Sequence, residues 1–180
     1  IFTPKSTLRH PSNTSSLVEF SGHSSFHRII DEEVNSPTRV IFCSGKIFYE
    51  LDDYRKQLKI KNIKIVRIEQ LYPFPFDTLG AVISKHKDCE FLWVQEEPKN
   101  MGPWGFVKSR IRHLFTKYKL DQKIHYVGRK RAAAPATGIA KRHNANQELI
   151  KQISLQASLK RVIKERIGVS FMKFKNLPRD

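Results

Sequence analysis

The chain has 180 residues, 39% of them hydrophobic, and a formal net charge of +16 at pH 7. That length fits one domain of common size with a single core, and no run reaches the ~20 apolar residues that a membrane-spanning helix needs. The two cysteines, Cys43 and Cys89, lie in apolar stretches without a second Cys or a His at metal-ligand spacing, so we expect buried free thiols and no metal site.

Residues 1–37 are rich in Ser, Thr, Asn, His and Pro and show no regular spacing of apolar residues, which predicts an irregular arm that ends at Pro37. We expect the apolar side chains of this arm to pack on another surface. They are Leu17, Val18, Phe20, Phe26, Ile29 and Ile30. The first residue is Ile1, which is typical of a fragment of a longer protein or of a mature form that has lost a leader.

From Arg39 onward, apolar runs alternate with helical spacing. The runs predict strands at 40–43, 63–68, 91–94 and 124–128. The helical spacing predicts helices over 47–58, 79–86, 103–118 and 142–153. Strands that alternate with helices predict an α/β fold with a mostly parallel sheet and helices on both faces. We therefore divide the chain into an N-terminal arm (1–37), an α/β domain (38–153) and a basic helical tail (154–180), with Gly45 and Gly128 at sharp turns that end strands.

Positive charge is concentrated in the second half of the chain. Residues 1–100 carry 14 Lys and Arg against 13 Asp and Glu, a net of +1, whereas residues 101–180 carry 19 against 4, a net of +15. Solvated surfaces usually mix the two signs, so one sign in such excess indicates a polyanionic partner, of which a nucleic acid backbone is the usual one. An acidic protein surface is the alternative.

The residues expected to bind such a partner are clustered Lys and Arg side chains. On the helix predicted over 103–118, Lys108, Arg112 and Lys119 fall within about 40° of one another at ~100° per residue, so they form one stripe. No Asp or Glu lies between Lys99 and Lys119, although a solvated helix face is the alternative interpretation. The full set of candidate nucleic-acid-binding residues is Lys108, Arg110, Arg112, Lys117, Lys119, Arg129, Lys130, Arg131, Lys141, Arg142, Lys160, Arg161, Lys164, Arg166, Lys173 and Lys175.

No pattern in the chain predicts a catalytic site. Glu96 and Glu97 are adjacent on a predicted strand, so their side chains point to opposite faces and cannot jointly hold a proton or a metal ion. The seven histidines are scattered without metal-binding spacing. We expect no catalytic residue, no cofactor and no metal ion in this chain.

Five longer stretches carry a more specific signal. They are TPKSTLRHP at 3–11, CSGKIFYEL at 43–51, RIEQLYPFP at 67–75, WVQEEPKNMGPW at 93–104 and YVGRKRAAAPATG at 126–138. In this order and spacing they closely resemble the C-terminal end of the E1 component of 2-oxoglutarate dehydrogenase. The resemblance extends over residues 1–153.

The resemblance implies a transketolase-type C-terminal domain, an α/β domain used for packing and dimer contact. It also implies that two preceding domains hold thiamine diphosphate, its magnesium and most of the 2-oxo-acid site. This chain contains no Gly-Asp-Gly of the kind a diphosphate–metal site needs. It departs from the family in Arg129-Lys130-Arg131, where a Gly-Arg-Lys-Pro-like turn is ordinary, and in a tail after residue 153 that has seven Lys and Arg against Glu165 and Asp180.

These observations support three hypotheses of function. The first is a non-catalytic structural subunit, derived from an E1 C-terminal domain, that contacts rRNA and neighbouring proteins of a large assembly such as the mitochondrial ribosome. The second is the C-terminal part of a working thiamine-diphosphate-dependent E1 that self-dimerises, decarboxylates 2-oxoglutarate and passes a succinyl group to lipoyl-E2. The third is an adaptor that binds E1 or E2 without chemistry. The resemblance and Ile1 lead us to expect the mitochondrial matrix as the location.

Overall fold

The computed structural model describes residues 4–156 of the chain. Six candidate residues of the predicted tail lie outside the described residues: Lys160, Arg161, Lys164, Arg166, Lys173 and Lys175. The described part is built on one five-stranded sheet, whose strands are β1 (Ile29–Asp31), β2 (Arg39–Cys43), β3 (Ile63–Ile68), β4 (Glu90–Pro98) and β5 (His125–Arg129). The four predicted strands are thus confirmed, with small shifts of their ends.

The order of the strands is β1-β3-β2-β4-β5. Strands β2, β3, β4 and β5 run parallel, and only β1 is antiparallel to its neighbour β3. The chain moves outward from β2 to β3 and then returns to β4 on the other side of β2. This reversal is the topological switch point of a doubly wound sheet, and it confirms the predicted mostly parallel α/β fold.

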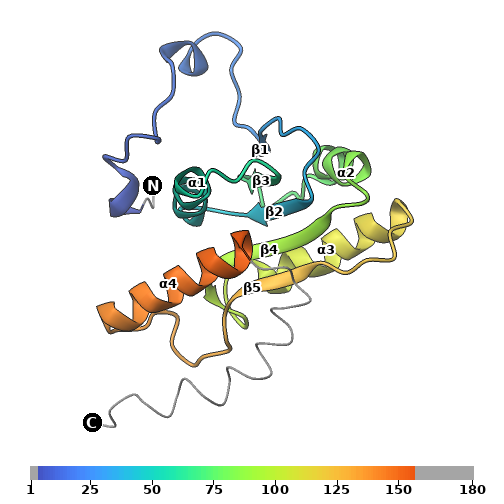
Figure 1. Ribbon diagram of the computed structural model, residues 1–180. Helices are drawn as coiled ribbons and strands as arrows, with labels where there is room; N and C mark the ends of the chain where they lie inside the picture. Colours follow the sequence, from blue (N-terminus) through green and yellow to red (C-terminus); the bar gives the residue numbers. More distant parts are fainter. Residues whose placement is uncertain (1–3, 157–180) are drawn as a thin grey trace.

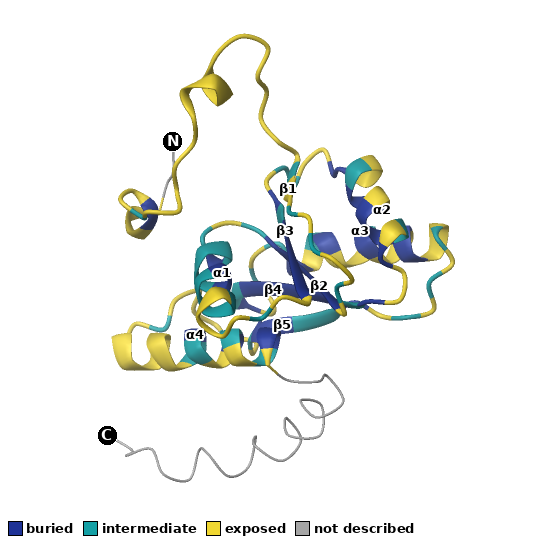
Figure 2. Ribbon diagram, turned by 45° about the horizontal axis from the view of Figure 1, so that its top comes forward, coloured by how far each residue is buried: buried dark blue, intermediate teal, exposed yellow. Residues whose placement is uncertain are grey.

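Four helices cover the two faces of the sheet (Figure 1). They are α1 (Ile47–Gln57), α2 (Phe76–Lys85), α3 (Trp104–Lys117) and α4 (Ala140–Leu155). Successive residues of a strand point to opposite faces, so Val40 and Phe42 of β2 pack in the core that includes α2 and α3. Ile41 and Cys43 pack in the core that includes α1 and α4. Figure 2 shows the three middle strands, β2, β3 and β4, as the buried centre of the domain.

The structure corrects two expectations for the arm. It contains β1, which pairs with β3 in the register Ile29↔Ile68 although no apolar periodicity marks it. The other correction concerns four apolar side chains that do not pack on any described part of the chain, since their exposed fractions lie between 76% and 103%: Leu17, Val18, Phe20 and Phe26. The arm instead contacts α1 through polar groups, among them the Tyr49 hydroxyl, which donates to the Asn13 side chain at 2.6 Å.

The two glycines singled out in the sequence serve different purposes. Gly45 follows β2 with φ 76°, so it makes the predicted sharp turn. Gly128 lies inside β5, and its predicted role as a turn is wrong. A Cβ at residue 128 would lie 2.7 Å from the carbonyl oxygen of Gln95 and 2.5 Å from the hydroxyl oxygen of Tyr126. Close approach between β4 and β5 therefore requires glycine there.

Candidate functional site

The basic surface of α3 is the first candidate site. Val107, Ile111 and Leu114 are fully buried at helical spacing, which leaves Lys108 and Arg112 exposed on the outer side of the helix. Neither makes an ion pair with a described residue, and the Lys108 ammonium lies 5.8 Å from the centre of the Trp104 ring. Lys117, at the end of α3, is also exposed.

Two of the five candidates around α3 do not belong to this surface. Helix α3 ends at Lys117, and Lys119 has a left-handed backbone with φ 58°, so its predicted place in the stripe is wrong. Arg110 is half-buried because its guanidinium lies on the Phe106 ring, 3.3 Å from the ring centre, and donates to the Phe106 carbonyl at 2.8 Å. The exposed stripe is therefore Lys108 and Arg112, and Lys117 is exposed at the end of the helix.

The remaining described candidates lie at the end of β5 and at the start of α4. Arg129 is half-buried and donates to the Pro135 carbonyl at 2.7 Å, which folds the following loop back on the strand. Lys130 and Arg131 are exposed, as are Lys141 and Arg142 in the first turn of α4. Since α3 and α4 cover opposite faces of the sheet (Figure 1), the structure does not bring the candidate cations together on one face.

A polar cluster occupies the carboxyl ends of β2 and β4, where ligands of doubly wound sheets usually bind. The Lys46 ammonium lies 2.5 Å from a Glu96 oxygen and 3.6 Å from a Glu50 oxygen. The Gln147 amide of α4 donates to both carboxylates at 3.2 Å. Burial opposes the charged form of Lys46, but the hydrogen bond and charge of Glu96 outweigh it and raise the pKa of the amine. The cluster thus joins α1, β4 and α4, and its single ammonium is shared by two carboxylates.

The sequence indicated Glu96 only as a possible partner of Glu97. The structure pairs Glu96 with Lys46, fifty positions earlier in the chain, and packs the Glu97 side chain beside Gly102. The available signal was the position of the two residues, because Lys46 and Glu96 each follow an apolar strand of a predicted parallel sheet. Residues in that position meet at one edge of the sheet.

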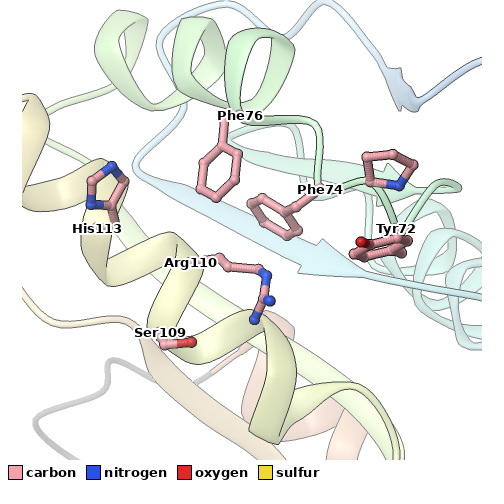
Figure 3. A pocket seen from close by; sticks show the side chains of 7 residues that line it. Tyr72, Phe74, Phe76, Ser109, Arg110 and His113 are labelled. Atoms are coloured by element: carbon pink, nitrogen blue, oxygen red, sulfur yellow. The ribbon is translucent and has the colours of Figure 1, made fainter.

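A pocket of ≈ 470 Å³ lies between α3 and the turn that precedes α2 (Figure 3). Its lining residues are Tyr72, Pro73, Phe74, Phe76, Ser109, Arg110 and His113. The side chains of Tyr72 and Phe76 are 80% and 40% exposed, which is unusual for aromatic residues so close together. In the sequence this segment was noted only as part of the stretch at 67–75, although its three aromatic residues at alternate positions were a visible signal.

The described residues offer no site for metal or thiol chemistry. No group of three or more His, Cys, Asp or Glu between residues 4 and 156 is placed to hold a metal ion. Cys43 and Cys89 are buried free thiols, as predicted. Burial raises the pKa of Cys43 to about 12, so its thiol is not ionised near pH 7 and is a poor nucleophile there. Nor is any helix of the described part long and apolar enough to cross a membrane.

Comparison with known proteins identifies relatives of this chain. A profile of the family described as 2-oxoglutarate dehydrogenase C-terminal matches residues 14–155. The chain is 40% identical over 162 residues to the 2-oxoglutarate dehydrogenase E1 components of Brucella ovis, Brucella canis and Brucella anthropi. These matches cover 81% of this chain but only 16% of each relative, so the chain spans a small part of the length of the proteins that it matches.

Proposed function

The chain belongs to the 2-oxoglutarate dehydrogenase C-terminal family, and from this premise we propose that it acts as the non-catalytic C-terminal domain of an E1 component. In this role the domain packs against the parts of E1 that bind thiamine diphosphate and supplies no group to the reacting atoms. Self-association of E1 and contact with lipoyl-E2 belong to the same proposal.

The observation that carries this proposal is the cluster at the carboxyl ends of β2 and β4, whose charged groups bind one another. Lys46 is held by Glu96 and Glu50, and Gln147 donates to both carboxylates. A site for diphosphate needs unpaired donors or cations, and a site for magnesium needs oxygen ligands that are free to coordinate. The described residues do not fit either group, because the charges at this edge are committed to one another.

The test uses the native protein that contains this sequence. We expect it to decarboxylate 2-oxoglutarate when thiamine diphosphate and magnesium are supplied. The double variant Lys46→Met/Glu96→Leu should keep the rate per folded enzyme within about twofold, because the pair is only half-buried and even a fully buried ion pair can often be replaced by apolar residues of similar size without loss of the fold. A native protein of 21.0 kDa without this activity would contradict the proposal.

A second candidate function is favoured by the exposed cations of α3. We propose, as the alternative, a structural subunit that binds an RNA backbone in a large assembly such as the mitochondrial ribosome, in the mitochondrial matrix. Phosphate contacts need cations with flexible reach and no neighbouring acid, and Lys108 and Arg112 meet both requirements among the described residues. A basic surface for an acidic protein partner, as in an adaptor, uses the same residues.

Sedimentation of a native mitochondrial extract, with and without RNase, separates the two candidate functions. A structural subunit on RNA should migrate with a ribosomal subunit and lose that position after RNase. A domain of E1 should migrate with lipoyl-E2 whether or not RNase is added. The second outcome would contradict RNA binding, and the exposed cations of α3 would then have to contact a partner other than RNA.

A further inference from the structure

His86 is a buried histidine outside both the polar cluster and the aromatic pocket. It follows α2 directly and is 8% exposed. Its Nε2 atom is enclosed by protein and has no hydrogen-bond partner among residues 4–156. A buried polar atom without a partner is rare in folded proteins, and its cost is far higher for a charged ring than for a neutral one. The surroundings of His86 therefore suit the neutral imidazole.

The charged groups that act most strongly on this imidazole come from three elements. Lys64 of β3 is enclosed, with 1% of its side chain exposed. Lys85 of α2 and Glu33, which follows β1, are 62% and 84% exposed, so water screens their charges. Asp31 of β1 already binds the Lys64 ammonium at 2.7 Å. A proton on His86 therefore places a second cation beside a buried one, without a carboxylate of its own.

Burial and charge both oppose the protonation of His86. Burial first, and then the charge of Lys64, lowers the pKa of the imidazole from its ordinary value of 6.5, and the charges of Asp31 and Glu33 act more weakly in the opposite direction. The closed structure thus binds the proton less tightly than a state in which the ring reaches water. The stability that depends on neutral His86 is complete above pH 6.5 and is lost as the pH falls through the lowered pKa.

Strand β1 is the neighbour of His86 that opens at the least cost. It has three residues, none of them fully buried, and lies at the edge of the sheet (Figure 1). By contrast, α2 buries Ile83 completely. Much of the hold on β1 is polar, because the Lys64 ammonium binds Asp31 and donates to the Glu32 carbonyl at 2.6 Å. Local opening concentrates in segments with few buried apolar contacts, so separation of β1 is the easiest way for the ring to reach water.

We propose that His86 makes the attachment of β1 sensitive to protons: once His86 is protonated, β1 and the arm joined to it separate from β3, while β2 to β5 stay folded. The arm keeps its contact with α1. His10 lies 3.3 Å from the Asp53 carboxylate, and this contact becomes an ion pair when His10 is protonated, so acid does not release that part of the arm. The inference is independent of either candidate function.

Hydrogen exchange of the full chain, followed by mass spectrometry, measures the opening of β1. The probes are the amides of Glu69 and Gln70, which both donate to the Arg28 carbonyl at 3.0 Å, next to β1. After correction for the intrinsic effect of pH, their protection factors should fall about three- to tenfold between about pH 7.5 and about pH 5.5. The upper limit is about tenfold, because the solvated imidazole has a pKa of about 6.5. Protection of β2 and β4 should change less than about twofold.

Two variants assign the effect to His86. His86→Gln carries a neutral side chain at every pH, so it should remove the pH dependence at Glu69 and Gln70. The matched control is His27→Gln, which should keep that dependence, because His27 is exposed and lies two residues before β1. Protection that does not change with pH in the parent, or that changes equally in His86→Gln, overturns the proposal.

A second measurement needs no substitution. Exchange of the imidazole C2 hydrogen for deuterium, followed by mass spectrometry across a range of pH, gives the pKa of each histidine in the parent protein. We expect a pKa below 6.5 for His86. A pKa of 6.5 or above would show that the closed structure favours the proton, and it would overturn the proposal even if His86→Gln does not fold.

Discussion

From Arg28 to β4 most cations of this domain lie in ion pairs, whereas Lys108 and Arg112 on α3 face solvent. The paired cations of this first region are Arg28, Arg39, Lys46, Arg55, Lys56, Lys64, Arg67 and Lys85. In the second region, from α3 to the end of α4, Lys108 and Arg112 have no acidic partner among the described residues. The same type of side chain thus stabilises the fold in one region and remains available for a partner in the other.

Burial explains why the two regions differ. The Lys64 side chain is 1% exposed and its ammonium lies 2.7 Å from Asp31, because a charge taken out of water needs a partner. Arg55 is similarly enclosed, between Glu32 and Asp52. The outer face of α3 stays in water, so its cations need no internal partner. The difference therefore follows from location in the fold and not from the number of charges.

The largest effect that we predict comes from Asp31→Ala in β1. The substitution removes the carboxylate beside Lys64, and an unpaired buried charge costs about 3–5 kcal/mol of unfolding free energy. Urea denaturation measures the loss. The double variant Asp31→Ala/Lys64→Met should recover most of it, since methionine removes the buried charge. A loss below about 1 kcal/mol would mean that the ion pairs of the first region are not structural.

Arg39→Ala should have the next largest effect, because Arg39 links the two regions. Its guanidinium binds Glu90 at 2.6 Å and donates to the Ser154 carbonyl in the last turn of α4 at 2.7 Å. Loss of these charged hydrogen bonds should lower the unfolding free energy by about 2 kcal/mol. Hydrogen exchange should accelerate more in α4 than in α3. The control is Lys85→Ala, whose exposed pair with Glu33 should contribute less than about 0.5 kcal/mol.

Alkaline pH tests whether a charge without a partner, on the buried thiol of Cys43, lowers the unfolding free energy of the first region. Burial raises the pKa of Cys43 from 9.0 to about 12, so the folded state holds the thiol proton more tightly than the unfolded state. The resulting stability is complete below pH 9 and is lost as the pH rises toward 12. Between pH 8 and 10 we expect a loss of about 1 kcal/mol that Cys43→Val lacks. Equal pH slopes for both proteins would contradict this prediction.

The smallest effect on stability, and the sharpest contrast, is predicted for Lys108→Gln/Arg112→Gln. Its unfolding free energy should stay within about 0.5 kcal/mol of the parent, because both side chains are exposed. If RNA is the partner, the slope of the logarithm of the binding constant against the logarithm of the salt concentration should become less steep by about 1 for each cation removed. The matched control is Lys59→Gln/Lys61→Gln, two exposed cations of the first region, which should change that slope less. A destabilised variant would show that the cations of α3 serve the fold.

The four parallel strands were predictable from the sequence because strands buried on both faces form continuous apolar runs. Every residue of β2 is buried, for example. Strand β1 was missed because it has three residues and ion pairs instead of apolar periodicity. Helical spacing correctly identified Lys108 and Arg112 as neighbours. It failed for Lys119, since the end of α3 depends on local backbone geometry that spacing does not encode.

The sequence by itself determined the alternation of strands and helices, the likeness to the E1 C-terminal domain and the concentration of positive charge in the second half, because each is written in local pattern or composition. Only the tertiary structure decided which cations are paired, that α3 and α4 lie on opposite faces, and that an aromatic pocket forms beside Arg110. These features join residues far apart in the chain, as Arg39 and Ser154 are joined. Such contacts arise only when the sheet brings distant segments side by side.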